Sequence, residues 1–210
     1  MRWLAWVVVL ASAEAAAVPC RTSEPAPAIL TPATATVDET GGIVATNPPR
    51  NGWELAQSTT AKQFELRNVA PGLVVIPLPT NGMFELRDSK HAVLASVTRG
   101  PTKVTPLPAP KPRLVRRTAP KSRGDDSTIT AVFAAKPPAG AVALIVFAKG
   151  KPRSWGRVTA GSTSIVVYRG ACQTTPPAGT ISSRIGEAIT LAWLDETGHV
   201  SAPSRVVKVR

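Results

Sequence analysis

The sequence has little of what enzymes use for catalysis. It holds two histidines, two cysteines and one tyrosine among 210 residues. No HExxH, GxSxG or CxxC pattern occurs, and no glycine-rich phosphate-binding loop follows a predicted strand. Two histidines, His91 and His199, with two cysteines that an oxidising compartment would oxidise, are a poor ligand set for zinc. We therefore expect a protein that is not an enzyme and that uses no metal or cofactor.

Acidic side chains are scarce beside basic ones. Aspartate and glutamate number 13 against 25 lysines and arginines, which gives a net charge of +12. Adjacent acids occur at Asp38-Glu39, Asp125-Asp126 and Asp195-Glu196, each near Gly, Ser or Thr, where an Asp accepts bonds from turn N–H groups. We interpret each pair as a turn former. Calcium, which takes about six to eight oxygen ligands, becomes an alternative if folding brings two pairs together.

The longest apolar run lies at the N-terminus. Arg2 precedes the apolar stretch 3–11, and small residues follow with cleavage positions after residues 13 and 17. This pattern predicts a signal peptide over residues 1–17. The run is shorter than the roughly 20 residues that span a bilayer, and no later segment is long enough. We expect an exported protein without a transmembrane segment, located in the periplasm, at the cell surface or outside the cell.

The two cysteines suggest one disulfide bond in an exported chain. Pairing Cys20 with Cys172 would close a loop of about 150 residues and stabilise the fold by about 4–5 kcal/mol in the chain-entropy model. Two unpaired thiols are the alternative. Cys20 also stands where a bacterial lipoprotein carries its acylated cysteine, but Pro19 before it argues against lipidation.

The body of the chain reads as short β-strands separated by turns. From residue 34 to 100, apolar runs alternate with turn dipeptides such as Asn81-Gly82, and no sustained helical period occurs. Residues 18–33 are proline-rich and form an expected extended tail. Residues 101–123 are basic, proline-rich and without an acid, and we predict a linker there that leads into a second domain over residues 124–210. The fold class is therefore all-β, with two small β-sandwich domains.

Two smaller patterns predict which side chains enter the core. The tetrad FELR occurs at residues 64–67 and 84–87, and we expect two similar strands whose Phe and Leu face inward. Trp193 is in register with Ile189 and Leu191, which predicts a core tryptophan.

The end of the chain resembles a known fold family. The stretch AITLAWLDETGHVSAPSRVVKV (188–209) looks like the last two strands of bacterial immunoglobulin-like and fibronectin type III-like domains, in which an alternating strand runs into Asp-x-x-Gly-Asn-x-Ser. Asp195, Gly198, Ser201 and Ser204 fit this pattern, whereas His199 stands where the family usually has Asn. The resemblance implies a β-sandwich with a modular adhesive or spacer role, and it fixes no ligand.

Basic residues gather around the predicted linker and in one later strand region. Such side chains with an interleaved aromatic residue can hold a phosphate or sulfate backbone, although a solvated linker explains them equally well. The candidate polyanion-binding residues are Lys111, Arg113, Arg116, Arg117, Lys121, Arg123, Lys149, Lys151, Arg153 and Trp155.

Three functions are consistent with these patterns. The first is a noncatalytic exported binding or scaffolding module of the cell envelope, whose partner is an anionic cell-surface polymer or another envelope protein. The second is a polyanion-binding protein that acts through its basic linker on anionic polysaccharide, lipopolysaccharide or nucleic acid. The third is a secreted hydrolase without a recognisable motif.

Overall fold

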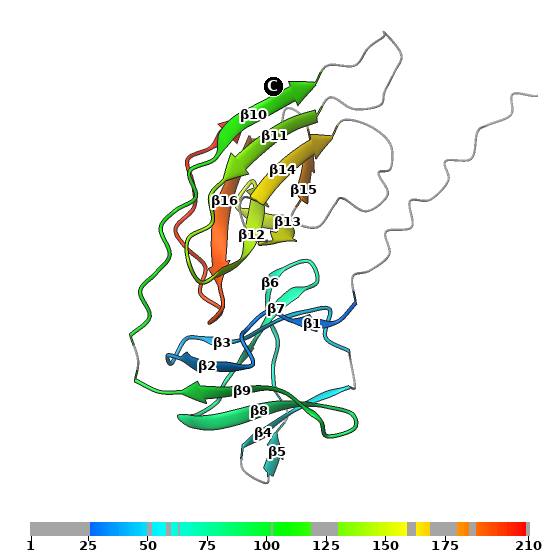
Figure 1. The fold of residues 1–210 in the computed structure, drawn as a ribbon, viewed down its shortest axis with the longest axis vertical. Helices are drawn as coiled ribbons and strands as arrows, with labels where there is room; N and C mark the ends of the chain where they lie inside the picture. Colours follow the sequence, from blue (N-terminus) through cyan, green and yellow to red (C-terminus); the bar gives the residue numbers. More distant parts are fainter. Residues whose placement is uncertain are drawn as a thin grey trace, which may run out of the picture.

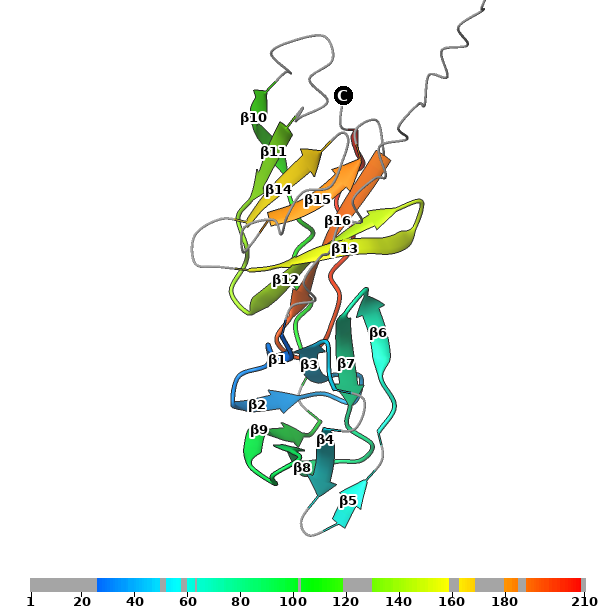
Figure 2. The same ribbon diagram turned by 90° about the vertical axis from the view of Figure 1, so that its right-hand side faces the viewer.

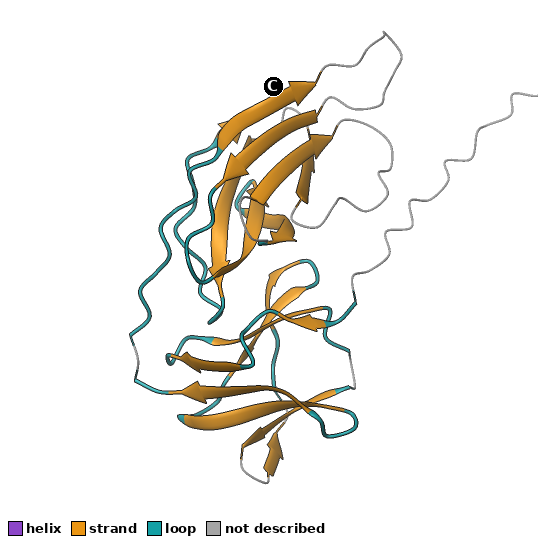
Figure 3. Ribbon diagram, viewed as in Figure 1, coloured by secondary structure: helices purple, strands orange, loops and turns teal. Residues whose placement is uncertain are grey.

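The structure, a computed structural model, consists of β-strands joined by loops. It describes residues 26–49, 52–57, 60–62, 64–101, 103–118, 130–158, 163–168, 180–184 and 188–208. All regular secondary structure in these residues is β-strand, which confirms the all-β prediction (Figure 3). Within the same ranges no helix has the length and apolar character to cross a membrane. The strands form two β-sandwiches that follow one another along the long axis of the molecule (Figure 1).

The N-terminal sandwich has the strand order of an immunoglobulin domain. Its first sheet contains, in order, β1 (Ala28–Ile29), β3 (Gly42–Thr46), β7 (Leu73–Pro77) and β6 (Arg67–Ala70). Its second sheet contains β2 (Thr34–Val37), β9 (Val93–Arg99), β8 (Gly82–Asp88), β4 (Trp53–Gln57) and β5 (Thr60–Lys62). These are the A-B-E-D and G-F-C sheets of the immunoglobulin fold, with the first strand divided so that β2 pairs in parallel with β9.

The C-terminal sandwich follows a related order. One sheet contains β10 (Arg113–Thr118), β11 (Thr130–Ala135), β14 (Thr163–Tyr168) and β15 (Thr180–Arg184), and β15 pairs in parallel with β14. The other contains β13 (Lys151–Arg157), β12 (Ala141–Ala148), β16 (Ala188–Asp195) and β17 (Val207–Lys208). Both sandwiches are thus immunoglobulin/fibronectin III-like, as the resemblance implied. Their division into two domains at the expected boundaries stays a prediction.

The proline-rich segment between the sandwiches is extended but not fully solvated. Residues 103–112 form no strand. Leu107 packs against the core of the C-terminal sandwich, and Pro110 and Pro112 are buried. A proline can be buried without leaving an unpaired N–H, because it has none. The segment therefore lies along the C-terminal sandwich rather than standing free as a spacer.

The predictions for individual core residues have mixed outcomes. Trp193 is 1% exposed, and Phe84 and Leu86 of the second FELR tetrad are fully buried, as predicted. In the first tetrad Phe64 packs against the N-terminal core as predicted, but Leu66 is 43% exposed and a strand begins only at Arg67. The side chain of Arg67 is directed to the C-terminal sandwich, where its guanidinium donates to the carbonyl of Gly198 over 2.8 Å.

A third apolar cluster, which we call the junction core, joins the two sandwiches. Strands β3, β7, β12 and β16 are apolar on both faces, and one face of each packs inside its own sandwich. Residues on their other faces belong to one buried cluster. Figure 2 shows β3 and β7 just below the lower ends of β12 and β16. The buried residues of the junction core are Leu30, Val44, Ala70, Leu73 and Val75 from the N-terminal sandwich and Ala143, Ile145 and Leu194 from the C-terminal sandwich.

Candidate functional site

Those predicted polyanion-binding residues whose side chains the structure describes do not converge on one surface. Lys111 and Arg113 are exposed beside β10, whereas Lys149, Lys151 and Arg153 are exposed on the hairpin of β12 and β13. Strands β10 and β13 are edge strands of different sheets. Strand β13 contacts β15, and β15 is the edge strand opposite β10 in the sheet that they share. Within the described ranges the basic residues therefore form two separate groups.

The remaining predicted residues are placed as follows. Arg116 and Arg117 belong to strand β10. Lys121, Arg123, Cys20 and Cys172 lie outside the described residues, so the disulfide stays a prediction.

Trp155 lies at the contact between the two sandwiches. Its side chain packs against the junction core, and its indole N–H donates to the carbonyl of Pro71 over 2.9 Å. The indole thereby connects β13 of the C-terminal sandwich to the turn between β6 and β7.

The strongest polar constellation surrounds His199 at the edge of the junction core. It forms on the turn that follows β16, where Asp195 Oδ1 accepts from the backbone N–H of Thr197 at 2.9 Å and of His199 at 2.8 Å. The Thr197 hydroxyl donates to the same oxygen over 2.8 Å. Asp195 is a turn former, as the sequence suggested, because a short carboxylate can satisfy several N–H groups of a tight turn.

A matching turn from the N-terminal sandwich faces it. Asp38 Oδ1 accepts from the backbone N–H groups of Thr40 and Gly41, each at 2.9 Å, and from the Thr40 hydroxyl at 3.0 Å. The two acidic turns, far apart in sequence, thus come together at one site. We call Asp38, Thr40, Asp195, Thr197 and His199 the junction clamp.

His199 occupies the space between the two carboxylates. Its Nε2 lies 2.9 Å from Asp38 Oδ1 and 2.8 Å from the Thr40 hydroxyl. On the other side, Nδ1 lies 2.8 Å from the Thr197 hydroxyl and 3.5 Å from Asp195 Oδ2. Because an ionised carboxylate only accepts, the contact with Asp38 requires a proton on Nε2.

Backbone groups complete the contact between the turns. The N–H of Gly42 donates to the Thr197 carbonyl over 2.8 Å, and the Thr31 hydroxyl donates to the Glu196 carbonyl over 2.8 Å. Gly41 and Gly198 permit this closeness, because a Cβ on Gly41 would lie 2.8 Å from the Thr197 carbonyl oxygen. A Cβ on Gly198 would lie 2.8 Å from a methyl of Val75.

The clamp shifts the ionisation of Asp38. Burial raises the pKa of this carboxyl, but hydrogen bonds from the Thr40 N–H and hydroxyl oppose it, as do the charge and hydrogen bond of His199. The hydrogen bonds and the His199 charge outweigh the effect of burial and hold the pKa of Asp38 below its ordinary value of 3.8. The folded state therefore favours the charged carboxylate.

The clamp has the residue types of a metal or catalytic site but a different geometry. The imidazole fills the position between the carboxylates that calcium would need, and no group of three or more His, Cys, Asp or Glu within the described ranges is arranged to hold a metal ion. Thr40, His199 and Asp195 are the types of a nucleophile triad. However, Asp38 shares Nε2 with the Thr40 hydroxyl, and the nearby N–H groups of Gly41 and Gly42 already donate to Asp38 and Thr197. The arrangement ties two turns together.

Sequence reasoning did not find the junction. A usable signal was present in IVA (43–45), LVVI (73–76) and ALIV (143–146), which are apolar at consecutive positions. Strands of an antiparallel sandwich usually alternate, with one face toward water. Continuous apolar strands in both halves indicate that both halves have a second buried face.

Comparison with known proteins does not assign the chain to a family. No protein-family model matches the chain, and no curated protein does. Among solved structures, the chain is similar to the fibronectin(III)-like modules of Clostridium thermocellum CbhA, with 17% sequence identity and a TM-score of 0.30 over 85% of this chain and 90% of that chain. The fold assignment given above rests on the strand order, and the functional argument rests on the junction.

Replacing Gly198 by Ala should weaken the junction more than backbone strain alone explains. A Cβ at Gly198 (φ +90°) would meet Val75, whereas a Cβ at Gly150 (φ +72°) would meet no atom within 4 Å. Both substitutions cost about 1–2 kcal/mol for a left-handed alanine. We expect Gly198→Ala to lower the free energy of unfolding, measured by urea titration, clearly more than Gly150→Ala. Equal losses would contradict the close approach.

The lowered pKa of Asp38 predicts how its contribution depends on pH. A carboxyl whose folded pKa is depressed stabilises the fold above its unfolded pKa, and this stability is lost as pH falls through the folded pKa. Asp38→Asn should therefore cost about 1–3 kcal/mol near neutral pH, as for a hydrogen-bonded charged group. The difference from wild type, from urea titrations, should shrink as the pH falls below 3.8 and through the lowered folded pKa of Asp38. Glu65→Gln, at an exposed carboxylate with no hydrogen bond to another described residue, serves as the control, and a pH-independent difference would refute the prediction.

Proposed function

We propose that the chain is a noncatalytic exported module of the cell envelope that holds two β-sandwiches in one fixed orientation. The observation that carries this proposal is the junction, where an apolar core and a polar clamp act together. Sandwiches joined only by a flexible segment move relative to each other by default, and a buried apolar interface is what prevents it. The junction core has eight buried residues from both sandwiches, which favours a rigid unit.

The hydrogen bonds across the junction support the same function because their strength depends on angle. Apolar contacts tolerate sliding, but hydrogen bonds do not, because they weaken steeply with angle. Gly42, Arg67 and His199 each make a directed contact across the junction. These bonds set the angle between the sandwiches, as a scaffold requires.

Export and envelope location are supported by the N-terminal pattern of residues 1–17, a positive residue before an apolar run and small residues. The partner is proposed to be an anionic surface polymer or another envelope protein. The fold class is consistent with this, because immunoglobulin-like sandwiches serve many surface proteins without fixing a ligand.

The rigid orientation can be tested by residual dipolar couplings. In the wild-type protein, one alignment tensor should fit the couplings of β7 and β8 together with those of β12 and β16. Ile145→Asp places a charge in the fully buried junction core, which costs about 3–5 kcal/mol when unpaired, and should make two tensors necessary.

Thr98→Asp is the matched control, because Thr98 is exposed on β9 and the substitution adds the same charge. It should keep one tensor. If the wild-type protein itself needs two independent tensors, the sandwiches are free to move and the scaffold proposal is wrong.

A second candidate function is polyanion binding. The observation that favours it is the hairpin of β12 and β13, where Lys149, Lys151 and Arg153 are exposed. None of them forms an ion pair with another described residue. Exposed cations on an outer hairpin are accessible to an anionic polymer, and the net charge of +12 favours such contact.

Charge reversal would test the second candidate. Lys149→Glu with Lys151→Glu should lower the salt concentration at which the protein leaves a sulfated-polysaccharide resin, as should Arg116→Glu with Arg117→Glu. Lys90→Glu with Lys208→Glu changes the net charge equally at exposed sites elsewhere. If this control pair lowers retention as much as the other two, binding reflects only net charge and neither basic group is a site.

A further inference from the structure

The C-terminal sandwich contains a slit where the pairing of β10 and β11 stops. Their ladder begins with Arg113 opposite Ala134. Beyond this pair, toward the junction, each segment is rich in proline, which has no N–H to continue the ladder. The two segments are therefore not joined by strand pairing there. The prolines concerned are Pro108, Pro110 and Pro112 on one side and Pro137 and Pro138 on the other.

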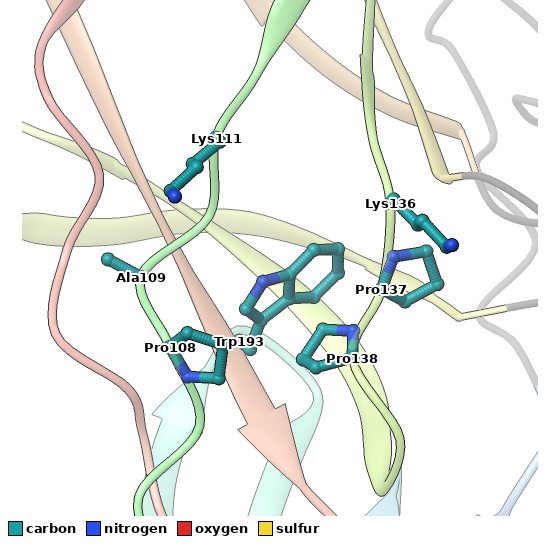
Figure 4. A pocket seen from close by; sticks show the side chains of 7 residues that line it. All are labelled: Pro108, Ala109, Lys111, Lys136, Pro137, Pro138 and Trp193. Atoms are coloured by element: carbon teal, nitrogen blue, oxygen red, sulfur yellow. The ribbon is translucent and has the colours of Figure 1, made fainter.

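The slit is a cavity of about 340 Å³ with the indole of Trp193 between its walls (Figure 4). This volume is near the lower end of the range of about 300–1,000 Å³ for small-molecule sites, so it suits a single ring. The lining residues are Pro108, Ala109, Lys111, Lys136, Pro137, Pro138 and Trp193.

Trp193 supplies a hydrogen-bond donor that has no partner. Its side chain is 1% exposed, and its Nε1 makes no hydrogen bond to any residue of the described chain. Figure 4 shows the indole nitrogen on the side that faces Pro108 and Ala109, within the slit. Nε1 is not among the buried side-chain atoms of the described residues that have no hydrogen-bond partner, so this N–H is open to the slit and can donate to an acceptor atom of a bound molecule.

Two lysines stand on opposite sides of the slit. Continuing the β10–β11 register toward the junction places Lys111 opposite Lys136, and both are exposed. In Figure 4 the two side chains extend away from the indole, and because a lysine side chain is long and flexible, each ammonium group can turn toward an anion at the mouth of the slit. The lining side chains include no carboxylate, and the site as a whole offers donors and apolar ring surfaces.

We propose that this slit binds a sugar ring that carries a carboxylate, as in a uronic acid unit of an acidic polysaccharide. The lysines would hold the carboxylate, Trp193 Nε1 would donate to a hydroxyl or ring oxygen, and the proline rings would pack against the C–H face of the sugar. The choice of a sugar among carboxylates rests on the proposed envelope location, where acidic polysaccharides are available. The binding site itself goes beyond the scaffold function.

The test is a titration with sodium glucuronate followed by ¹H–¹⁵N correlation spectra of the indole N–H groups. The Trp193 signal, assigned by its loss in Trp193→Phe, should shift and saturate. The Trp155 signal should stay in place, because that indole already donates to Pro71. A trigalacturonate titration distinguishes a polymer unit from a free monosaccharide by its tighter binding.

Variants at the slit complete the experiment. Lys111→Gln with Lys136→Gln should weaken glucuronate binding about tenfold or more, equivalent to about 1.4 kcal/mol. Lys90→Gln with Lys208→Gln removes the same charge from exposed positions that do not line the slit and should change the affinity less than about twofold. Glucose should not bind.

Three results would overturn the proposal. They are an unchanged affinity in the slit variant, an equal response to glucose, and an equal response to sulfate at matched ionic strength, which would indicate any small anion rather than a ring. The alignment-tensor measurement does not involve the slit. A failure of glucuronate binding therefore leaves the scaffold function intact, and a loss of rigid orientation leaves the slit intact.

Discussion

The rest of this structure depends on the burial of two apolar sheet faces against each other. In a single immunoglobulin-like sandwich, the outer faces of the sheets meet water and carry polar side chains. Here Val44, Leu73 and Val75 on one side and Ile145 and Leu194 on the other have almost no exposure, although they point away from the cores of their own sandwiches. An exposed patch of this kind on either half would be an aggregation liability, so the two halves require each other.

The polar groups at the edge of this contact give it a defined geometry. Their net contribution to stability is modest, because each bond replaces one with water, but a misaligned junction would leave them partly buried and unpaired. His199 is central because its two nitrogens reach Asp38 on one sandwich and Thr197 on the other. Asparagine, usual at this position in the family that the chain resembles, has a shorter side chain. The histidine is therefore explained by the neighbouring sandwich rather than by its own.

The sequence predicted those parts of the fold that have strong local patterns. The alternation in Phe84 and Leu86 and in Leu191 and Trp193 identified core strands correctly. Strand β10 was not predicted, because its residues lie within the segment predicted as a basic linker, and edge strands carry charges that hide the pattern. The clamp could not be predicted, since Asp38 and His199 are 161 residues apart and no local pattern relates them. Trp193 was predicted as a core residue. That its indole N–H faces an open slit could not be predicted, because this depends on where the proline-rich segments beside β10 and β11 stop pairing.

The doubly apolar strands also set an order of events during synthesis. The chain is made from its N-terminus, and domains tend to fold as they emerge. Strands β3 and β7 therefore form while β12 and β16, the strands that cover their outer face, do not yet exist. During that interval the nascent N-terminal sandwich exposes an apolar sheet face to solvent. A chaperone that holds the chain until residue 194 has been translated would protect this protein at its most vulnerable stage.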